Sequence, residues 1–187
     1  GDLAFEEAVS IFGEVIQAGA QAGADLVLIE TMNDSYESKA AVLAAKENCD
    51  LPVCITNTYD ESGTLMTGAT VESMVAMLEG LGVDALGVNC GVGPIQMKGV
   101  IQRLIDASSL PIIVNPNAGL PSQIHGRTVY DLKAEMFAST MVEIADMGVQ
   151  VMGGCCGTTP EYIERMIHMV KQKPFQTNTK KNRSVIS

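Results

Sequence analysis

The sequence predicts an α/β fold built around a parallel sheet. Short apolar runs alternate with longer stretches in which apolar residues recur at a helical period. Short continuous apolar runs are typical of strands buried on both faces, as in parallel sheets. Successive strand–helix units imply right-handed crossovers, and two architectures fit the pattern: an open doubly wound sheet and a (β/α)8 barrel of the TIM type.

Strands and helices are expected in strict alternation after an opening helix. The expected strands are residues 25–30, 52–56, 85–89, 111–114 and 150–152. Two helix starts carry sequence signals, because Asp34 and Glu37 have capping-box spacing and Thr159 precedes a Pro at a first helical position. The expected helices are residues 4–19, 35–48, 71–81, 95–107, 131–147 and 160–171.

The strand count favours part of a barrel. A complete barrel needs eight strands and about 250 residues, whereas this chain of 187 residues offers five strand–helix units. We therefore expect residues 1–173 to hold the last five units of a (β/α)8 barrel, with the opening helix following the third barrel strand. Residues 174–187 are polar and aperiodic, and are expected to form a linker towards a following domain.

Charge and composition argue against several functional classes. The chain has 12 basic and 22 acidic residues, a net charge of −10, which argues against a nucleic-acid partner. No apolar run reaches the roughly 18 residues of a membrane helix, and the first residues lack the positive charge of a secretory signal. Five cysteines are an odd number, which favours reduced thiols and a cytoplasmic location.

Three cysteines stand where α/β proteins place their sites. Cys90 directly follows the third expected strand, and Cys155 and Cys156 follow the fifth. The carboxyl ends of parallel strands meet at one edge of a sheet, and the glycines around the cysteine pair permit a sharp turn. Cys49 and Cys54 are instead interpreted as small apolar residues at a helix end and inside a strand.

Three thiolates are a ligand set that suits Zn²⁺. Structural zinc sites have four protein ligands, whereas a site with three leaves one position open. Such an electron-rich site is a poor Lewis acid for carbonyls, but it lowers the pKa of a bound thiol, so the pattern predicts activation of a substrate thiol for alkyl transfer. The alternative is that the Gly-rich turn binds an anion at the start of the last helix and the cysteines are incidental.

Two further polar residues follow strands at the same edge. Glu30 ends the first strand, and Asn117 lies in the segment NPNAGLP after the fourth. Their alternative interpretations are a solvated carboxylate and a turn residue. Residues 115–130 are expected to form a long loop placed to cover a pocket, and His125 and His168 are expected on the surface.

Four segments make the sequence resemble the homocysteine S-methyltransferase family, in particular the homocysteine-binding domain of cobalamin-dependent methionine synthases. They are ADLVLIETMNDSYESKAA, GVNCGVGP, NPNAGLP and GGCCGTTPEYI, in the order of the family. Family members begin with a DGAMGT-like first strand and a TNTF-like second segment, neither of which opens this chain.

The resemblance implies a (β/α)8 barrel whose zinc is held by Cys90, Cys155 and Cys156. It also implies that Glu30 and Asn117 belong to the substrate-binding site. Glu30 is expected to hold the amino group of homocysteine, and Asn117 is expected to lie near the metal, where its amide oxygen is a candidate fourth ligand without substrate. The implied reaction is methyl transfer to the thiolate of homocysteine, forming methionine. The implied donor is methylcobalamin, supplied through folate- and cobalamin-binding domains of a parent chain.

Three rival hypotheses accompany this prediction. In the first hypothesis, the methyl donor is S-methylmethionine or betaine, as elsewhere in the family. Alternatively, the chain is a non-catalytic barrel fragment with a structural or vestigial zinc site. In the third hypothesis, it is a phosphate-binding α/β enzyme that uses its Gly-rich turn as an anion cradle.

Overall fold

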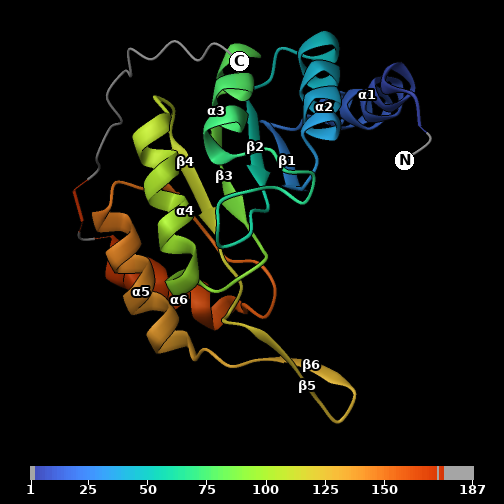
Figure 1. The fold of residues 1–187 in the computed structure, drawn as a ribbon. Coiled ribbons are helices and arrows are strands. Elements are labelled where there is room, and N and C mark those ends of the chain that lie inside the picture. Colours follow the sequence, from blue (N-terminus) through green and yellow to red (C-terminus); the bar gives the residue numbers. More distant parts are fainter. Residues whose placement is uncertain (1–2, 172, 175–187) are drawn as a thin grey trace.

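A five-stranded parallel sheet forms the centre of the molecule (Figure 1). The computed structural model describes residues 3–171 and 173–174. The strands of the sheet are β1 (Val27–Met32), β2 (Val53–Asn57), β3 (Ala85–Asn89), β4 (Ile112–Asn115) and β7 (Val151–Met152). Each pairs in parallel with the next, so all five carboxyl ends lie at one edge. The five predicted strands are confirmed to within two residues at each end.

The described residues form six helices beside the sheet. They are α1 (Phe5–Gln21), α2 (Ser35–Asn48), α3 (Val71–Gly80), α4 (Pro94–Ala107), α5 (Ala134–Asp146) and α6 (Pro160–Val170). The predicted cap of α2 is present, because Asp34 Oδ1 accepts a hydrogen bond from the backbone N–H of Glu37 at 2.8 Å. None of the helices in the described ranges combines the length and the apolar character needed to cross a membrane.

The order of the strands decides between the two architectures. It runs β1-β2-β3-β4-β7, with no reversal of direction along the sheet. A doubly wound sheet requires such a reversal, whereas a barrel adds each strand on the same side of the previous one. Each helix also packs against the next, from α1 through to α6. The described residues therefore form part of a TIM-type barrel; the predicted linker, residues 174–187, lies outside them except for Pro174.

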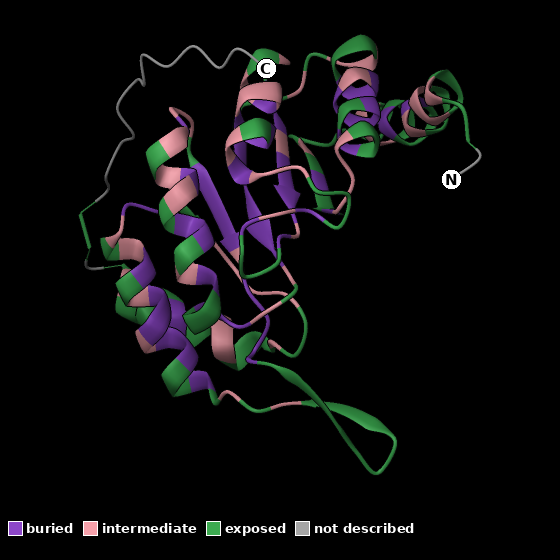
Figure 2. Cartoon of the chain, viewed as in Figure 1, coloured by how far each residue is buried: buried purple, intermediate pink, exposed green. Residues whose placement is uncertain are grey.

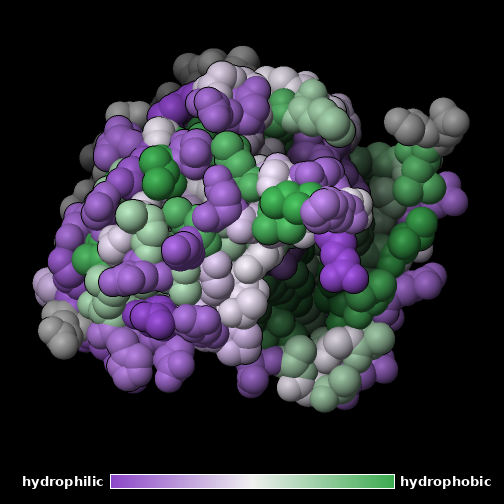
Figure 3. Space-filling model, turned by 90° about the horizontal axis from the view of Figure 1, so that it is seen from below, coloured by the Kyte–Doolittle hydropathy of each residue, from purple (hydrophilic) through white to green (hydrophobic). Residues whose placement is uncertain are grey.

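The core lies between the sheet and the helices, and most residues of the central strands β2, β3 and β4 are buried (Figure 2). Every residue of β3 is buried, and Gly87 is required there because a Cβ atom would lie 1.9 Å from the carbonyl oxygen of Ile113 on β4. The two outer strands differ, since Leu28 on β1 and Val151 on β7 are 46% and 45% exposed. Seen from the side of the strand ends, the molecule has a hollow with hydrophobic walls (Figure 3).

The segment between β4 and α5 differs from the predicted pocket-covering loop. It contains an antiparallel hairpin of β5 (Pro121–Ile124) and β6 (Arg127–Tyr130), which projects from the body (Figure 1). His125 and Gly126 form its two-residue turn, both with positive φ, as hairpin turns of this length require. At the base of the hairpin, the Asp131 carboxylate accepts a hydrogen bond from the backbone N–H of Leu120. Because Asp131 belongs to this loop, α5 begins at Ala134, three residues later than predicted.

Candidate metal and substrate-binding site

The sulfur atoms of the three predicted cysteines converge at the carboxyl edge of the sheet. The Sγ atom of Cys156 lies 3.8 Å from that of Cys90 and 3.9 Å from that of Cys155. All three sulfurs lie within 4.8 Å of one another, and in the described part of the chain this is the one group of His, Cys, Asp or Glu side chains with metal-ligand spacing. The structure therefore brings Cys90 together with Cys156, which lies 66 residues later in the sequence.

Hydrogen bonds from the segment after β4 hold the cysteine turn in place. The backbone N–H of Cys155 donates to the carbonyl of Pro116 at 2.8 Å, and that of Cys156 donates to Asn117 Oδ1 at 3.0 Å. The N–H of Ala118 donates in return to the carbonyl of Cys156 at 2.9 Å. The two adjacent cysteines are thus fixed by bonds to a neighbouring loop as well as by their own glycine-rich turn.

Cys90 is held in a strained backbone conformation. Its φ is 59°, a region that side chains other than glycine rarely adopt and that costs about 1–3 kcal/mol. Its N–H donates to the carbonyl of Asn115 at 3.1 Å, and its own carbonyl accepts from Val92 at 2.8 Å. Strain that surrounding hydrogen bonds maintain in this way is characteristic of functional sites.

The thiols influence one another electrostatically. Burial, together with the charge of Cys90, raises the pKa of Cys155 to about 12. Burial also opposes ionisation of Cys156, but hydrogen bonds with Tyr130 and Cys90 outweigh it and hold the pKa of Cys156 below its usual value. Three thiolates this close together would repel one another, so a bound cation would stabilise them. A soft divalent metal such as Zn²⁺ fits this donor set.

Glu30 lies near the same edge of the sheet, but it does not end its strand as predicted, because β1 continues to Met32. Its carboxylate is exposed, and Asn115 Nδ2 at the end of β4 donates to Glu30 Oε1 at 3.3 Å. Asn115 is the residue whose carbonyl accepts the N–H of Cys90, so one asparagine contacts both the carboxylate and a cysteine. Asn115 thus links Glu30 on β1 to β4, which lies between the two strands that precede the cysteines.

Asn117 is buried, with 3% of its surface exposed. Its amide oxygen accepts the N–H of Cys156, which gives Asn117 a role in holding the cysteine turn. Its predicted roles as a substrate-binding residue and as a fourth metal ligand without substrate stay predictions.

Sequence reasoning missed three contributors to the site: Asn89, Asn115 and Tyr130. The two asparagines are the last residues of the buried strands β3 and β4, and a polar residue closing an apolar run was the available signal. Tyr130 ends the hairpin and forms a hydrogen bond with Cys156. A Cβ atom on Gly157 would lie 2.4 Å from the Tyr130 ring, so the ring covers the glycine of the cysteine turn.

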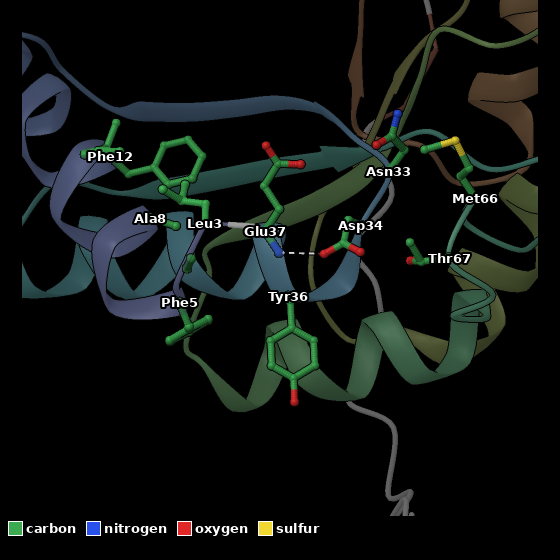
Figure 4. A pocket seen from close by; sticks show the side chains of 12 residues that line it. Leu3, Phe5, Ala8, Phe12, Asn33, Asp34, Tyr36, Glu37, Met66 and Thr67 are labelled. Atoms are coloured by element: carbon green, nitrogen blue, oxygen red, sulfur yellow. Dashed lines mark hydrogen bonds between the residues drawn. The ribbon is translucent and has the colours of Figure 1, made fainter. Parts of the chain in front are cut away.

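A large cavity lies elsewhere, between α1 and α2 (Figure 4). It has a volume of about 800 Å³, and Leu3, Phe5 and Phe12 contribute to its apolar wall. Asp34 and Glu37 line it too, but the dashed line in Figure 4 shows that the Asp34 carboxylate is already engaged as the helix cap. Neither the cysteines nor Glu30 line this cavity, so it is separate from the candidate metal site at the strand ends.

Comparison with known proteins identifies the family of this chain. The model of the homocysteine S-methyltransferase family matches residues 1–170. The chain belongs to this family. It is 37% identical over 150 residues to the methionine synthase of Mycobacterium leprae and 35% identical to that of Mycobacterium tuberculosis. Each match covers 77% of this chain but only 12% and 13% of those proteins, so the chain spans a small part of the length of these relatives.

Solved structures agree with the fold. The apo form of the homocysteine methyltransferase MmuM from Escherichia coli superposes with a TM-score of 0.74 at 25% identity, covering 89% of this chain and 57% of MmuM. The metallated form of MmuM gives 0.71 at 26% identity, covering 86% and 52%. The carboxyl transferase domain of pyruvate carboxylase from Rhizobium etli, at 17% identity and a TM-score of 0.52 over 78% of this chain and 24% of that chain, shares the fold alone. The predicted family and fold class are confirmed.

Proposed function

We propose that this chain carries the homocysteine-activating site of a zinc-dependent methyltransferase that forms methionine. The observation that carries the proposal is the convergence of three cysteine sulfurs within 4.8 Å at the carboxyl edge of the sheet. Membership of the homocysteine S-methyltransferase family supports it, as does the existence of a metallated form of MmuM. Three protein ligands leave a position for a substrate atom, which is the arrangement of catalytic zinc sites.

The residues have separate tasks in this proposal. Cys90, Cys155 and Cys156 hold the zinc ion, which when bound would supply the charge that keeps the substrate thiol ionised at neutral pH. The Glu30 carboxylate accepts a hydrogen bond from the ammonium group of homocysteine. Asn115 orients this carboxylate by donating a hydrogen bond to it. The thiol proton leaves to solvent on binding; sulfur then forms a bond to the methyl carbon, whose bond to the donor breaks, and the electron pair of that bond stays with the donor.

The proposed donor is methylcobalamin presented by another domain of a longer enzyme. The identity of 37% and 35% to methionine synthases, against 25% and 26% to MmuM, supports this donor. The relatives' greater length leaves room for the folate- and cobalamin-binding domains that a methionine synthase needs, and these domains are the proposed partners. The rival donors are S-methylmethionine and betaine.

Calorimetry with homocysteine tests the proposed activation. Titration of the zinc-loaded chain in buffers of different ionisation enthalpy should show that binding releases about one proton, since a metal ligand binds deprotonated. A chain that binds zinc but not homocysteine would contradict the proposal and support the non-catalytic fragment. Phosphate protection of the amides of residues 153–159 from hydrogen exchange would support the anion-cradle hypothesis instead.

The donor has its own test. The zinc-loaded chain is incubated with homocysteine and an excess of free methylcobalamin, S-methylmethionine or betaine, and methionine is quantified. Methionine should form with methylcobalamin. Formation with S-methylmethionine or betaine alone would overturn the donor assignment but leave the zinc site intact.

A further inference from the structure

Asn89 is a buried polar side chain at the centre of the strand ends. It is the last residue of β3, the middle strand of the sheet, and none of its surface is exposed. A buried amide is stable only when its polar atoms have partners, so the partners of Asn89 show what this residue is placed to do.

On one side Asn89 reaches across β2 to Thr31 at the end of β1. Its Oδ1 accepts the backbone N–H of Thr31 at 3.1 Å, and its Nδ2 donates to Thr31 Oγ1 at 2.7 Å. Because a backbone N–H can only donate, the amide orientation of Asn89 is determined. Thr31 has a φ of 65°, which is unfavourable for a β-branched residue. These two hydrogen bonds between Asn89 and Thr31 therefore stabilise the strained backbone of Thr31, the residue directly after Glu30.

On the other side Asn89 reaches past β4 to the cysteine turn. Its Nδ2 lies 3.8 Å from Cys155 Sγ, within the range of an N–H···S hydrogen bond. The backbone of Asn89 is fixed as well, since Thr58 Oγ1 donates to its carbonyl at 3.1 Å and the next residue is Cys90. One side chain thus links the strand that carries Glu30 to the turn that carries two of the three cysteines.

We infer that Asn89 is a positioning residue that sets the location of Glu30 relative to the metal-binding cysteines. This inference rests on the proposed function. In homocysteine, the thiol and the ammonium group are separated by a fixed carbon chain, so a site that binds both must hold its two receptors at a matching distance. Asn89 contacts neither group of the substrate; it orients the Thr31 peptide next to the carboxylate and the sulfur of Cys155.

Two variants of the full chain test the inference. Asn89→Asp keeps the shape and the acceptor for the Thr31 N–H, but replaces the Nδ2 group that donates to Thr31 Oγ1 and faces Cys155 with a carboxylate oxygen; Asn89→Ala removes all three contacts. The matched control is Asn57→Asp, because Asn57 is equally buried at the end of β2 and bonds to Met32 and Ser38 rather than to a cysteine.

The first measurement is metal binding, followed with Co²⁺ through its sulfur-to-metal absorption band. Asn89→Asp should weaken metal binding by about 10- to 100-fold and shift the band, because a neighbour of a metal ligand controls that ligand's charge and orientation. Asn89→Ala should have a smaller effect, because no negative charge faces the sulfur. Asn57→Asp should leave the band unchanged, although the variant loses stability.

The second measurement is the preference for homocysteine over 4-mercaptobutyrate, which has the same thiol and carboxylate but no amino group. Asn89→Ala should reduce this preference by about tenfold, the effect of one charge-assisted hydrogen bond. An unchanged preference with an unchanged band in both Asn89 variants would overturn the inference. Loss of the far-UV circular dichroism signal in both would assign Asn89 to folding instead.

The outcome for the unmodified chain separates this inference from the proposed function. If the unmodified chain binds neither metal nor homocysteine, the proposed function is wrong, and this inference is wrong with it. If it binds both and the Asn89 variants behave as the control does, only the inference is wrong.

Discussion

The strand-end site and the cavity between α1 and α2 differ in how they use their polar groups. In the cavity, the Asp34 carboxylate caps a helix, and much of the wall is apolar, with Phe5 and Tyr36 in edge-to-face contact at 6.0 Å. At the strand ends, three thiols converge, and asparagines form hydrogen bonds with the cysteines and with the Glu30 carboxylate. The candidate site is therefore distinguished from the cavity by its cluster of metal-binding side chains and not by its volume.

Backbone strain separates the two regions as well. Among the described residues other than glycine, Thr31, Cys90 and His125 have positive φ, and the first two lie at the strand ends. No residue of the cavity wall is in this group. Strain of this kind persists only where other contacts determine the backbone, so the strand-end region is the more tightly specified of the two.

The largest expected effect comes from disrupting the strand pairing that supports the site. Gly87→Ala places a Cβ atom 1.9 Å from the backbone oxygen of Ile113, so β3 and β4 must separate. We expect the free energy of unfolding to fall by at least about 3 kcal/mol, measured by urea denaturation.

Gly99→Ala is the matched control for this substitution. Gly99 lies within α4, with no neighbouring atom within 4 Å of its added Cβ, so alanine should stabilise the chain by about 0.5–1 kcal/mol. Equal effects of the two substitutions would contradict the close approach of β3 and β4.

A smaller effect is expected from displacing Tyr130. Gly157→Ala introduces a Cβ atom 2.4 Å from the Tyr130 ring, which must move away from Cys156. We expect zinc affinity to fall by about 10- to 100-fold in a chelator competition assay, because Tyr130 supports a metal ligand. Tyr130→Phe sharpens this prediction, since it keeps the ring and removes only the hydroxyl group.

The control for Gly157→Ala is Gly23→Ala. Gly23 also has a positive φ, 88°, but no atom lies within 4 Å of an added Cβ. This substitution should cost about 1–2 kcal/mol of stability through the backbone alone, with zinc affinity unchanged. If Gly157→Ala behaves in the same way, Tyr130 does not support the metal site.

The smallest expected effect belongs to the cavity. Asp34→Ala removes the cap of α2 and should reduce the free energy of unfolding by about 1 kcal/mol, measured by thermal or urea denaturation. Zinc content and homocysteine binding should not change, because Asp34 contacts none of the cysteines. A loss of homocysteine binding in this variant would show that the cavity belongs to the substrate site.

Much of the fold was predictable because the strands of a parallel sheet are buried on both faces. The run ALGVN, for example, is a short apolar run typical of a strand buried on both faces, and it forms β3 without a shift at either end. The convergence of Cys90 with Cys155 and Cys156 followed from the same property, since the carboxyl ends of parallel strands share one edge. These features depend on local pattern and on a general rule of topology.

The features that were not predictable depend on contacts between distant segments. Asn89 contacts both Thr31 and Cys155, and nothing in the sequence near Asn89 indicates either partner. The hairpin was missed because its turn, His125-Gly126, lacks the Asn or Asp that usually signals a two-residue turn. The role of Tyr130 was missed for the same reason, because the hairpin brings the Tyr130 ring to the cysteine turn.

Metal content is the measurement that tests the central claim most directly. The chain is purified after growth with zinc, and zinc is quantified by mass spectrometry beside the variants Cys90→Ala, Cys155→Ala and Cys156→Ala; Cys54→Ala, a cysteine away from the site, serves as the control. We predict about one zinc ion per chain in the unmodified protein and in the control, and a large loss in each of the other three variants. Zinc missing from the unmodified chain, or equal zinc in all five proteins, would contradict the account.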